Sequence, residues 1–381
     1  MIISVKDAIK LIGISIVSFC AVFVSTFMLN YYLDVLPLRG GITDTAILAL
    51  YEAQLATAKF SSGISGGVLS LIALIMLFFY IKIYIDAHAR QFGIIKAMGY
   101  ADHKIAFGFW VFGLSIFLGC ACGFAMAWAI MRPIYDSLTI EGMGSIAINF
   151  HWELLIGLVF APGIVFSLFA CLYAYRSLGR PVMQLIKDKN DFASIKAKDY
   201  SRYKEKPFLK AMGLSVLKSK KSLAFFIAFS CFCFSAMVQM GLSMKDLSSD
   251  IMGYMILIIG LVLAAVTMIM SVTTLIRSNQ KNISVMKAFG YSLRDCIICL
   301  FAIYVPFALL GFALGTVYQY GLLQLMINVV FSKVDVIPQY SFDVPIFFIT
   351  LAAFIVCYSV VILFYINRMS KISVKEIMIE N

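Results

Sequence analysis

Charged side chains are scarce in this sequence: Asp, Glu, Lys and Arg make up 13% of its 381 residues, whereas 62% are hydrophobic. A soluble domain needs a largely polar and charged surface, which so few charges cannot supply. None of the 20 acidic residues lies inside a long apolar run. Carriers driven by protons or sodium ions generally need ionisable groups near the centre of the membrane. The composition therefore indicates an integral membrane protein and argues against a secondary transporter.

Motifs for nucleotide and metal binding are also missing. The sequence has no G-x-x-x-x-G-K-[ST] loop to hold nucleotide phosphates, so we expect that the chain is not an enzyme and has no cofactor of its own. Its histidines, His88, His103 and His151, are scattered along the chain, which argues against a metal site built from them. Cys296 and Cys299 form a C-x-x-C pair without a second pair or a nearby histidine, so they are interpreted as packing residues.

Long apolar runs fill most of the chain, and eight of them contain no charged residue. A helix needs roughly 20 residues to cross about 30 Å of hydrocarbon, and each run reaches this length. The predicted fold is therefore all-α and membrane-embedded, with eight transmembrane helices. Helix-forming residues over Thr45–Lys59 predict that the second span begins above the membrane. The predicted spans are Leu11–Tyr32, Phe60–Ile81, Ile105–Met131, Leu154–Tyr175, Ser222–Met244, Ile251–Ile276, Cys296–Ser332 and Val344–Asn367.

Lys and Arg residues predict the orientation of these spans, because basic residues are retained on the cytoplasmic side. With the N-terminus inside, 25 of the 31 fall in cytoplasmic segments and five in outer segments. Both termini are thus expected in the cytoplasm, with an uncleaved first helix. The net charge of +11 is mainly a topology signal, with attraction to anionic membrane lipid as a secondary effect. Nucleic-acid binding is not expected, because the basic residues lack interleaved stacking aromatics.

One short segment occurs twice, as Ile94-Ile-Lys-Ala-Met-Gly-Tyr100 and as Val285-Met-Lys-Ala-Phe-Gly-Tyr291, each time between two apolar runs. The tails after the fourth and eighth spans, which begin at Pro181 and Ser373, also resemble each other. Internal repeats of this kind indicate duplicated structural units. We predict two four-helix modules joined by a basic cytoplasmic linker, with the boundaries 1–180, 181–221 and 222–381.

Two further patterns concern helix packing and the membrane surface. Gly119 and Gly123, like Gly311 and Gly315 in the second half, are spaced as G-x-x-x-G, which predicts close helix packing. Aromatic residues near the predicted outer boundaries are interpreted as an interfacial belt. They are Tyr31, Tyr32, Trp128, Tyr135, Trp152 and Tyr340.

The first repeated segment, Arg90-Gln-Phe-Gly-Ile-Ile-Lys-Ala-Met-Gly-Tyr100, resembles the one that follows the second helix in FtsX-like (MacB-like) ABC transporter permeases. The family pattern is approximately Arg-Glu-Ile-Gly-Ile-Leu-Lys-Ala-Leu-Gly, and the copy from Lys281 to Tyr291 is similar but looser. Gln91 or Phe92 stands at the position of the family's Glu. Two modules in one chain without an ATPase domain resemble the BceB-type arrangement, here with eight spans instead of ten and without a large extracellular domain.

The resemblance implies that each repeated segment is a cytosolic coupling helix that rests in a groove of a separate ABC ATPase subunit, which binds ATP and Mg²⁺. Independently of the resemblance, Gly99 and Gly290 can end a helix in a left-handed conformation. Lys96 and Lys287 are expected to meet acidic groups or lipid headgroups. A plain inner-leaflet turn stabilised by lipid is the alternative. The predicted coupling residues are Arg90, Phe92, Ile95, Lys96, Met98, Gly99 and Tyr100, and Lys281, Val285, Lys287, Phe289, Gly290 and Tyr291.

The expected function is that of the permease subunit of an ABC transporter in the bacterial cytoplasmic membrane, driven by two ATPase subunits. The family resemblance implies mechanotransmission, in which outer elements move without a central transport cavity. Small outer loops favour export or extraction of a lipid-like molecule or an amphipathic peptide. One alternative is an antimicrobial-peptide sensing and resistance module that signals to a membrane histidine kinase with little net transport. Another is a membrane scaffold without an ATPase.

Overall fold

A computed structural model of the chain describes residues 12–41, 45–138, 146–183, 217, 221–247, 250–279, 283, 286, 290–330 and 342–370. Within these residues helices dominate and no β-strand is present. Eight of the helices are long and apolar enough to cross a membrane, which confirms the predicted all-α membrane fold. They lie at Ile12–Gly40, Tyr51–Asp86, Asp102–Asp136, Trp152–Leu178, Leu223–Ser243, Leu257–Ile276, Phe301–Asn328 and Val344–Phe364.

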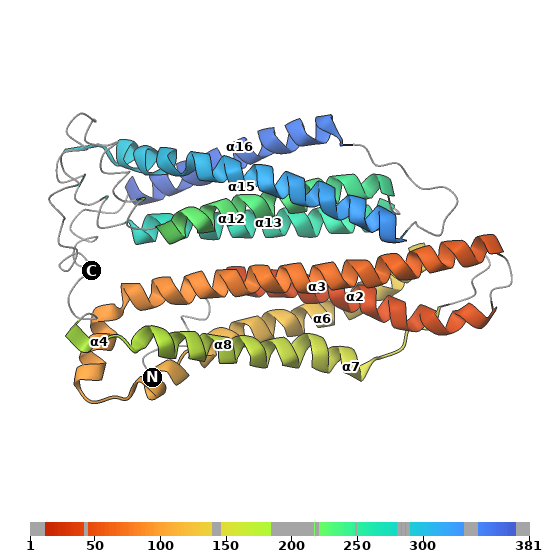
Figure 1. The fold of residues 1–381 in the computed structure, drawn as a ribbon, viewed down its shortest axis with the longest axis horizontal. Helices are drawn as coiled ribbons and strands as arrows, with labels where there is room; N and C mark the ends of the chain where they lie inside the picture. Colours follow the sequence, from red (N-terminus) through yellow and green to blue (C-terminus); the bar gives the residue numbers. More distant parts are fainter. Residues whose placement is uncertain are drawn as a thin grey trace. The chain divides into compact units, whose positions relative to one another are not determined.

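The chain forms two compact units, and most of the first half belongs to one of them. Helix α2 is its central element, because it packs against both α3 and α6, while α8 covers α3 and α6 (Figure 1). Two short helices, α4 and α5, connect α3 to α6. The elements are α2 (Ile12–Val35), η1 (Leu36–Gly41), α3 (Thr45–Ala87), α4 (Ala89–Ala97), α5 (Asp102–Phe107), α6 (Trp110–Leu138), α7 (Trp152–Leu155), η2 (Ile156–Phe160) and α8 (Ala161–Leu178).

Helix α3 is longer than one membrane span requires. Its 43 residues correspond to about 65 Å at about 1.5 Å per residue, roughly twice the hydrocarbon thickness. The predicted helix over Thr45–Lys59 is therefore present as the first part of α3, and its position above the membrane stays a prediction. Its first turns are held to the end of α2, because the buried Tyr51 hydroxyl donates to the carbonyl of Val35 at 3.1 Å. An exposed Arg39–Glu52 ion pair at 3.1 Å adds a second contact.

The fourth span contains a π-helical turn, η2, between α7 and α8. Pro162 lies in the first turn of α8 and explains this irregularity. A proline lacks the backbone N–H, and its ring clashes with the carbonyl four residues earlier, so the preceding turn widens. The span continues as one apolar segment to Leu178.

The second half contains four long helices among its described residues. Aromatic rings from three of them meet in its core, where Phe354 lies 5.6 Å from Phe234 and 5.2 Å from Phe312, measured between ring centroids. Helix α15 is a single helix of 38 residues, and this length accounts for the unusually long seventh apolar run. Pro306 lies within it. The elements are α12 (Lys221–Leu247), α13 (Asp250–Ser278), α15 (Leu293–Val330) and α16 (Val344–Ser370).

The paired glycines set a close helix contact in each half. A Cβ atom on Gly119 or Gly123 of α6 would collide with the backbone of α2. A Cβ atom on Gly311 or Gly315 of α15 would collide in the same way with the backbone of α12. The predicted role of the G-x-x-x-G pairs in close packing is therefore confirmed, and the same helix pair is joined in both halves.

Candidate functional site

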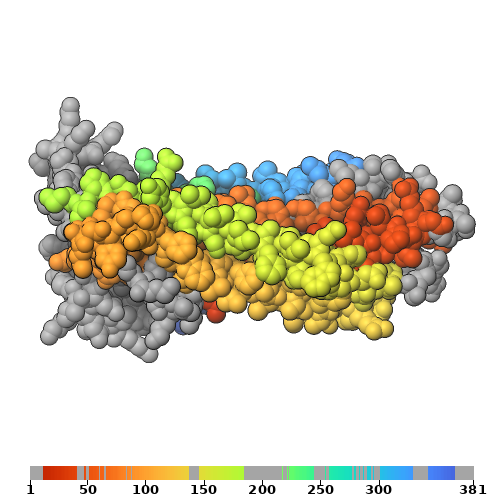
Figure 2. Space-filling model, turned by 90° about the horizontal axis from the view of Figure 1, so that it is seen from below, coloured from red at the N-terminus to blue at the C-terminus, as the bar shows by residue number. Residues whose placement is uncertain are grey.

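The first repeated segment forms an elbow, defined here as residues 89–107, which comprises α4, α5 and the turn between them. It leads from the end of α3 to the start of α6, and α5 packs against α8. Figure 2 shows the elbow, in orange, at one end of the first half beside the end of α8. The elbow is therefore the surface that this half presents at the side predicted to be cytoplasmic.

Gly99 ends α4 in the way that the sequence predicts. Its φ angle of +89° lies in the left-handed region, which side chains with a Cβ atom seldom adopt. The N–H of Gly99 donates to the carbonyl of Lys96 at 3.0 Å, and that of Tyr100 to Ile95 at 3.3 Å. This is the hydrogen-bond pattern of a Schellman motif, and it turns the chain sharply between α4 and α5.

The second copy of the segment shares this turn where the structure describes it. Gly290 also has a φ angle of +89°, and the N–H of Tyr291 donates to the carbonyl of Met286 at 3.2 Å. The repeat in sequence is therefore a repeat in backbone conformation. The other predicted coupling residues of this copy lie outside the described residues, namely Lys281, Val285, Lys287 and Phe289. Most of the predicted linker, residues 181–221, lies outside them as well.

The elbow has one buried face and one exposed face. Phe92 is buried, and its ring lies 6.0 Å from Phe109, so this residue anchors the elbow to the helices. On the other face, Ile94 is 48% exposed and Met98 is 70% exposed. Arg90 and Tyr100 are also exposed, whereas Ile95 is half-buried. An apolar edge of this kind on a rigid turn is suited to docking in a groove of another protein.

Lys96 meets an acidic group, which is one of the two expected environments, but that group belongs to the elbow itself. Its Nζ lies 3.0 Å from a carboxylate oxygen of Asp102, 3.0 Å from the carbonyl of Leu178 and 3.1 Å from that of Arg180. The three N–H bonds of the ammonium thus have acceptors within the first half, and the side chain is only 19% exposed. A cation is favourable there, because the last carbonyls of α8 carry partial negative charge. Lys96 therefore ties the elbow to the end of α8.

A second contact joins the end of α8 to the end of α3. The guanidinium of Arg180 lies 3.6 Å from the carboxylate of Asp86. Both side chains are partly exposed, so the pair adds little stability by itself. Together with Lys96, it connects the elbow to the adjacent ends of α3 and α8. Movement imposed on the elbow would therefore be shared by α3, α6 and α8.

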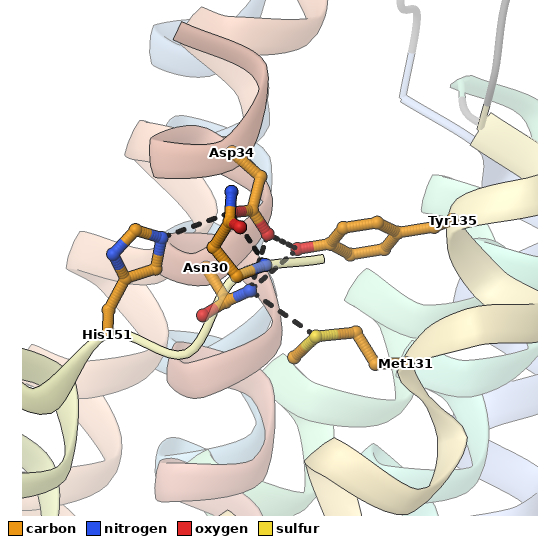
Figure 3. A network of polar contacts seen from close by, with 6 residues as sticks. Asn30, Asp34, Met131, Tyr135 and His151 are labelled. Atoms are coloured by element: carbon orange, nitrogen blue, oxygen red, sulfur yellow. Dashed lines mark hydrogen bonds and ion pairs between the residues drawn. The ribbon is translucent and has the colours of Figure 1, made fainter. Parts of the chain in front are cut away.

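The opposite end of the first half contains a buried polar cluster that the sequence patterns did not predict (Figure 3). Asn30 donates to the carboxylate of Asp34 at 2.7 Å, and the hydroxyl of Tyr135 donates to it at 3.1 Å. The backbone N–H of Asn149 donates to the second carboxylate oxygen at 3.2 Å, and the Nε2 of His151 lies 3.1 Å from that oxygen. The Asp34 side chain has no exposed surface. The cluster therefore joins α2, α6 and the segment before α7.

The sequence assigned two members of this cluster to ordinary positions. Asp34 lies just beyond the first predicted span, and the interpretation of Tyr135 as part of the interfacial belt is wrong because Tyr135 is buried. Tyr31, assigned to the same belt, is also buried. One local signal was present: Asn30 and Asp34 are four residues apart and thus share a helix face.

The second half has a polar network without charge. The Nε2 of Gln239 in α12 lies 3.1 Å from the hydroxyl of Ser235, 3.0 Å from that of Thr316 in α15 and 3.2 Å from that of Thr350 in α16, so its two N–H bonds are shared among three acceptors. Amide and hydroxyl bonds of this kind hold membrane helices together. Over the described part of the chain, no group of three or more His, Cys, Asp or Glu side chains is placed to hold a metal ion. The elbow therefore remains the candidate site, and the buried cluster around Asp34 lies at the opposite end of the first half.

Comparison with known proteins gives one result. The family model of the FtsX-like permease C-terminal domain matches the chain twice, over residues 63–182 and 254–374. No curated protein and no solved structure matches the chain. The first match includes the whole elbow, and the second includes Gly290 and Tyr291. The two matches cover more than half of the chain.

Proposed function

The chain belongs to the FtsX-like permease family, whose members generally work with ABC ATPases, and we propose that its two repeated segments are the points where two such subunits engage it. The protein is thus a multi-pass permease of the ABC transporter type. The elbow is the observation that supports the proposal most directly. Its apolar edge at Ile94 and Met98 is exposed, while Phe92 and Lys96 anchor it to the spans.

The proposed mechanism is mechanotransmission. The ATPase subunits bind ATP with Mg²⁺, close upon each other and displace the two repeated segments, and hydrolysis then releases them. This chain takes no part in the hydrolysis. The elbow passes its displacement to α3 and α6, which it joins directly, and to α8 through Lys96. Movement of the outer ends of these helices is the proposed work on the cargo.

The proposed cargo is a lipid-like molecule or an amphipathic peptide in the outer leaflet of a bacterial cytoplasmic membrane. Support comes from the small outer loops, which leave little protein to enclose a soluble cargo. The bias of basic residues supports a topology in which both termini and both repeated segments lie in the cytoplasm. Signalling to a histidine kinase is the competing function that the experiment must separate from transport.

The experiment is a purification of the tagged chain from native membranes, with identification of the proteins that copurify and an ATPase assay. We expect an ABC ATPase in stoichiometric amount. Substitution of Gly99 and Gly290 by Val should abolish stimulated ATPase activity while the chain stays folded, because Val cannot adopt the left-handed turn. Gly67→Val in α3 is the control, because a Cβ atom there meets nothing within 4 Å.

Three outcomes would contradict parts of the proposal. Recovery of the chain without any ATPase would favour a scaffold. Full activity of the double Val variant would show that the elbow turn is not part of the coupling. Recovery of a histidine kinase with the complex, together with peptide-dependent kinase activity and no cargo movement, would favour the signalling function.

A further inference from the structure

The burial of the Asp34 carboxylate is energetically unfavourable unless hydrogen-bond donors surround it. Asp34 lies at the outer end of a membrane-spanning helix, and its side chain has no exposed surface. A buried charge is tolerated only where donors surround it. Asp34 has such donors on both carboxylate oxygens: Asn30 and Tyr135 on one, Asn149 and His151 on the other. Ionisable groups of this kind in membrane proteins are functional candidates by default.

The segment that Asp34 holds carries two exposed aromatic rings. The contacts alternate along this segment. The N–H of Asn149 and the ring of His151 contact Asp34. The rings of Phe150 and Trp152 contact other aromatic rings. Phe150 is 45% exposed and Trp152 is 67% exposed. The ring centroid of Phe150 lies 5.1 Å from that of Trp128 on α6 and 5.0 Å from that of Trp152. Asp34 therefore fixes the backbone from which an aromatic ledge projects, defined here as Phe150 and Trp152.

The second half repeats the ring contact between Phe150 and Trp128 but has a leucine at the position of Asp34. Phe342 lies 6.0 Å from Tyr320, and these residues occupy the places of Phe150 and Trp128 in the repeat. Leu247 occupies the place of Asp34 when α12 and α2 are aligned through the residues that contact the paired glycines. The contact between these two rings is thus common to both modules, whereas a leucine stands in the second at the position of Asp34.

One helix connects the elbow with this cluster. Helix α6 begins three residues after α5 ends, at Trp110, and Tyr135 lies in its last turn. Trp128, which contacts Phe150, is on the same helix. Helix α6 contains Pro133 but continues to Leu138, so displacement of the elbow reaches the Asp34 cluster along one continuous helix, and the cluster passes it to the segment before α7.

We propose that Asp34 is a positioning residue that couples the aromatic ledge of Phe150 and Trp152 to α2 and α6. With Asp34 in place, the ledge follows α6 when the elbow moves, and it works on cargo at the outer membrane interface. The origin of the movement rests on the proposed function, whereas the attachment of the ledge rests only on the contacts of Asp34.

The attachment is tested on the purified chain in lipid nanodiscs by amide hydrogen exchange. The variant is Asp34→Leu, which introduces the residue type of the second half, with Asp34→Asn as a second variant of nearly unchanged size. Asp136→Leu is the control, because Asp136 is an exposed carboxylate near the same end of α6. Loss of the charged acceptor should accelerate exchange at Asn149 by about tenfold or more in Asp34→Leu, and by less in Asp34→Asn. Unchanged exchange in both variants would overturn the proposal.

The coupling is tested in the complex with the ATPase, with Trp152 as the reporter and Trp110 and Trp128 replaced by Phe. We expect ATP to change the fluorescence quenching of Trp152 in the otherwise unaltered chain and in Asp136→Leu. In the Asp34 variants this response should be lost while the ATPase still copurifies. A retained response would overturn the coupling role. Failure to recover any ATPase would contradict the proposed function, and the exchange rates at Asn149 would then decide the role of Asp34 by themselves.

Discussion

At the residue scale, the role of Lys96 is decided by where its ammonium lies. The Lys is part of the family-like segment, in which an acidic group or a lipid headgroup is the expected contact, and a lipid headgroup would leave it free of the helices. Its partners in the structure are instead Asp102 and the carbonyls at the end of α8. Lys96 is therefore a brace of the elbow, while the exposed residues Ile94 and Met98 remain available for a partner.

Lys96→Met should loosen this brace. The substitution leaves a carboxylate and two carbonyls without their donor, which is expected to cost about 1 to 3 kcal/mol. Thermal unfolding in detergent, followed by circular dichroism, is the measurement. Lys104→Met is the matched control, because Lys104 is exposed on the same elbow. Equal stability of the two variants would show that the contacts of Lys96 are dispensable.

Gly99 tests the left-handed turn by itself. An Ala at a φ angle of +89° is strained by about 1 to 2 kcal/mol, so Gly99→Ala should lower the free energy of unfolding. Gly67→Ala should be neutral or slightly stabilising, since helical Ala is favoured over Gly and the Cβ atom has open space. The comparison requires only the unfolding curves of the two variants, and a stable Gly99→Ala chain would refute the assignment of strain.

At the scale of elements, the glycine pairs set how closely α2 approaches α6 and how closely α12 approaches α15. Helices in a membrane gain no hydrophobic driving force from association, so close packing and hydrogen bonds hold them together. The same pairing in both halves explains why two sequences that differ widely outside the repeat adopt the same arrangement of first and third spans.

Helix α15 offers a comparison of two glycines on one element. Gly311→Ala should cost about 1 to 3 kcal/mol, because its Cβ atom would collide with the backbone of α12 at Ala228 and force the helices apart. Gly321→Ala, where a Cβ atom meets nothing within 4 Å, should be tolerated. Thermal aggregation of the detergent-solubilised variants distinguishes the two, and matching midpoints would contradict the role of close contact.

At the scale of the whole molecule, the orientation in the membrane determines which end of the first half meets an ATPase. The elbow lies at the end of α3, and the Asp34 cluster lies at the end of α2, so the two sites belong to opposite ends of the spans. The distribution of basic residues predicts that the elbow lies on the cytoplasmic side.

This orientation is tested by labelling with a membrane-impermeant maleimide in a chain whose nine cysteines have been replaced. A Cys at Gln91, which is exposed on the elbow, should react only after the membrane is permeabilised. A Cys at Asp136, exposed near the outer end of α6, should react in intact cells. The reverse labelling pattern would invert the topology and place the elbow beyond the reach of a cytoplasmic ATPase.

The sequence predicted features that depend on neighbouring residues. Apolar runs predicted the spans, because a helix must satisfy its backbone internally in a membrane and the hydrocarbon thickness sets its length. Gly99 and Gly290 predicted left-handed turns, because glycine has no Cβ atom to oppose them. The repeat predicted duplicated modules, and the two family matches agree with it.

Features that join distant residues were not predicted. Lys96 is bound by carbonyls 82 and 84 positions away, and Asp34 is bound by residues 101 to 117 positions away. A charge at a span end is compatible with solvent, lipid headgroups or a buried partner, and nothing in its local sequence distinguishes these environments. Phe92 shows the same limit, because its inward direction depends on how the elbow turns.

By itself, the sequence determined that this chain crosses a membrane eight times, repeats one module and turns sharply at two glycines. Length, hydropathy and backbone sterics decide these properties over short stretches of chain. The tertiary structure alone decided that Lys96 braces the elbow and that Asp34 holds the outer segment. These roles arise from side chains that only helix packing brings within hydrogen-bonding distance, and the cost of leaving a buried charge unpaired gives such contacts their physical significance.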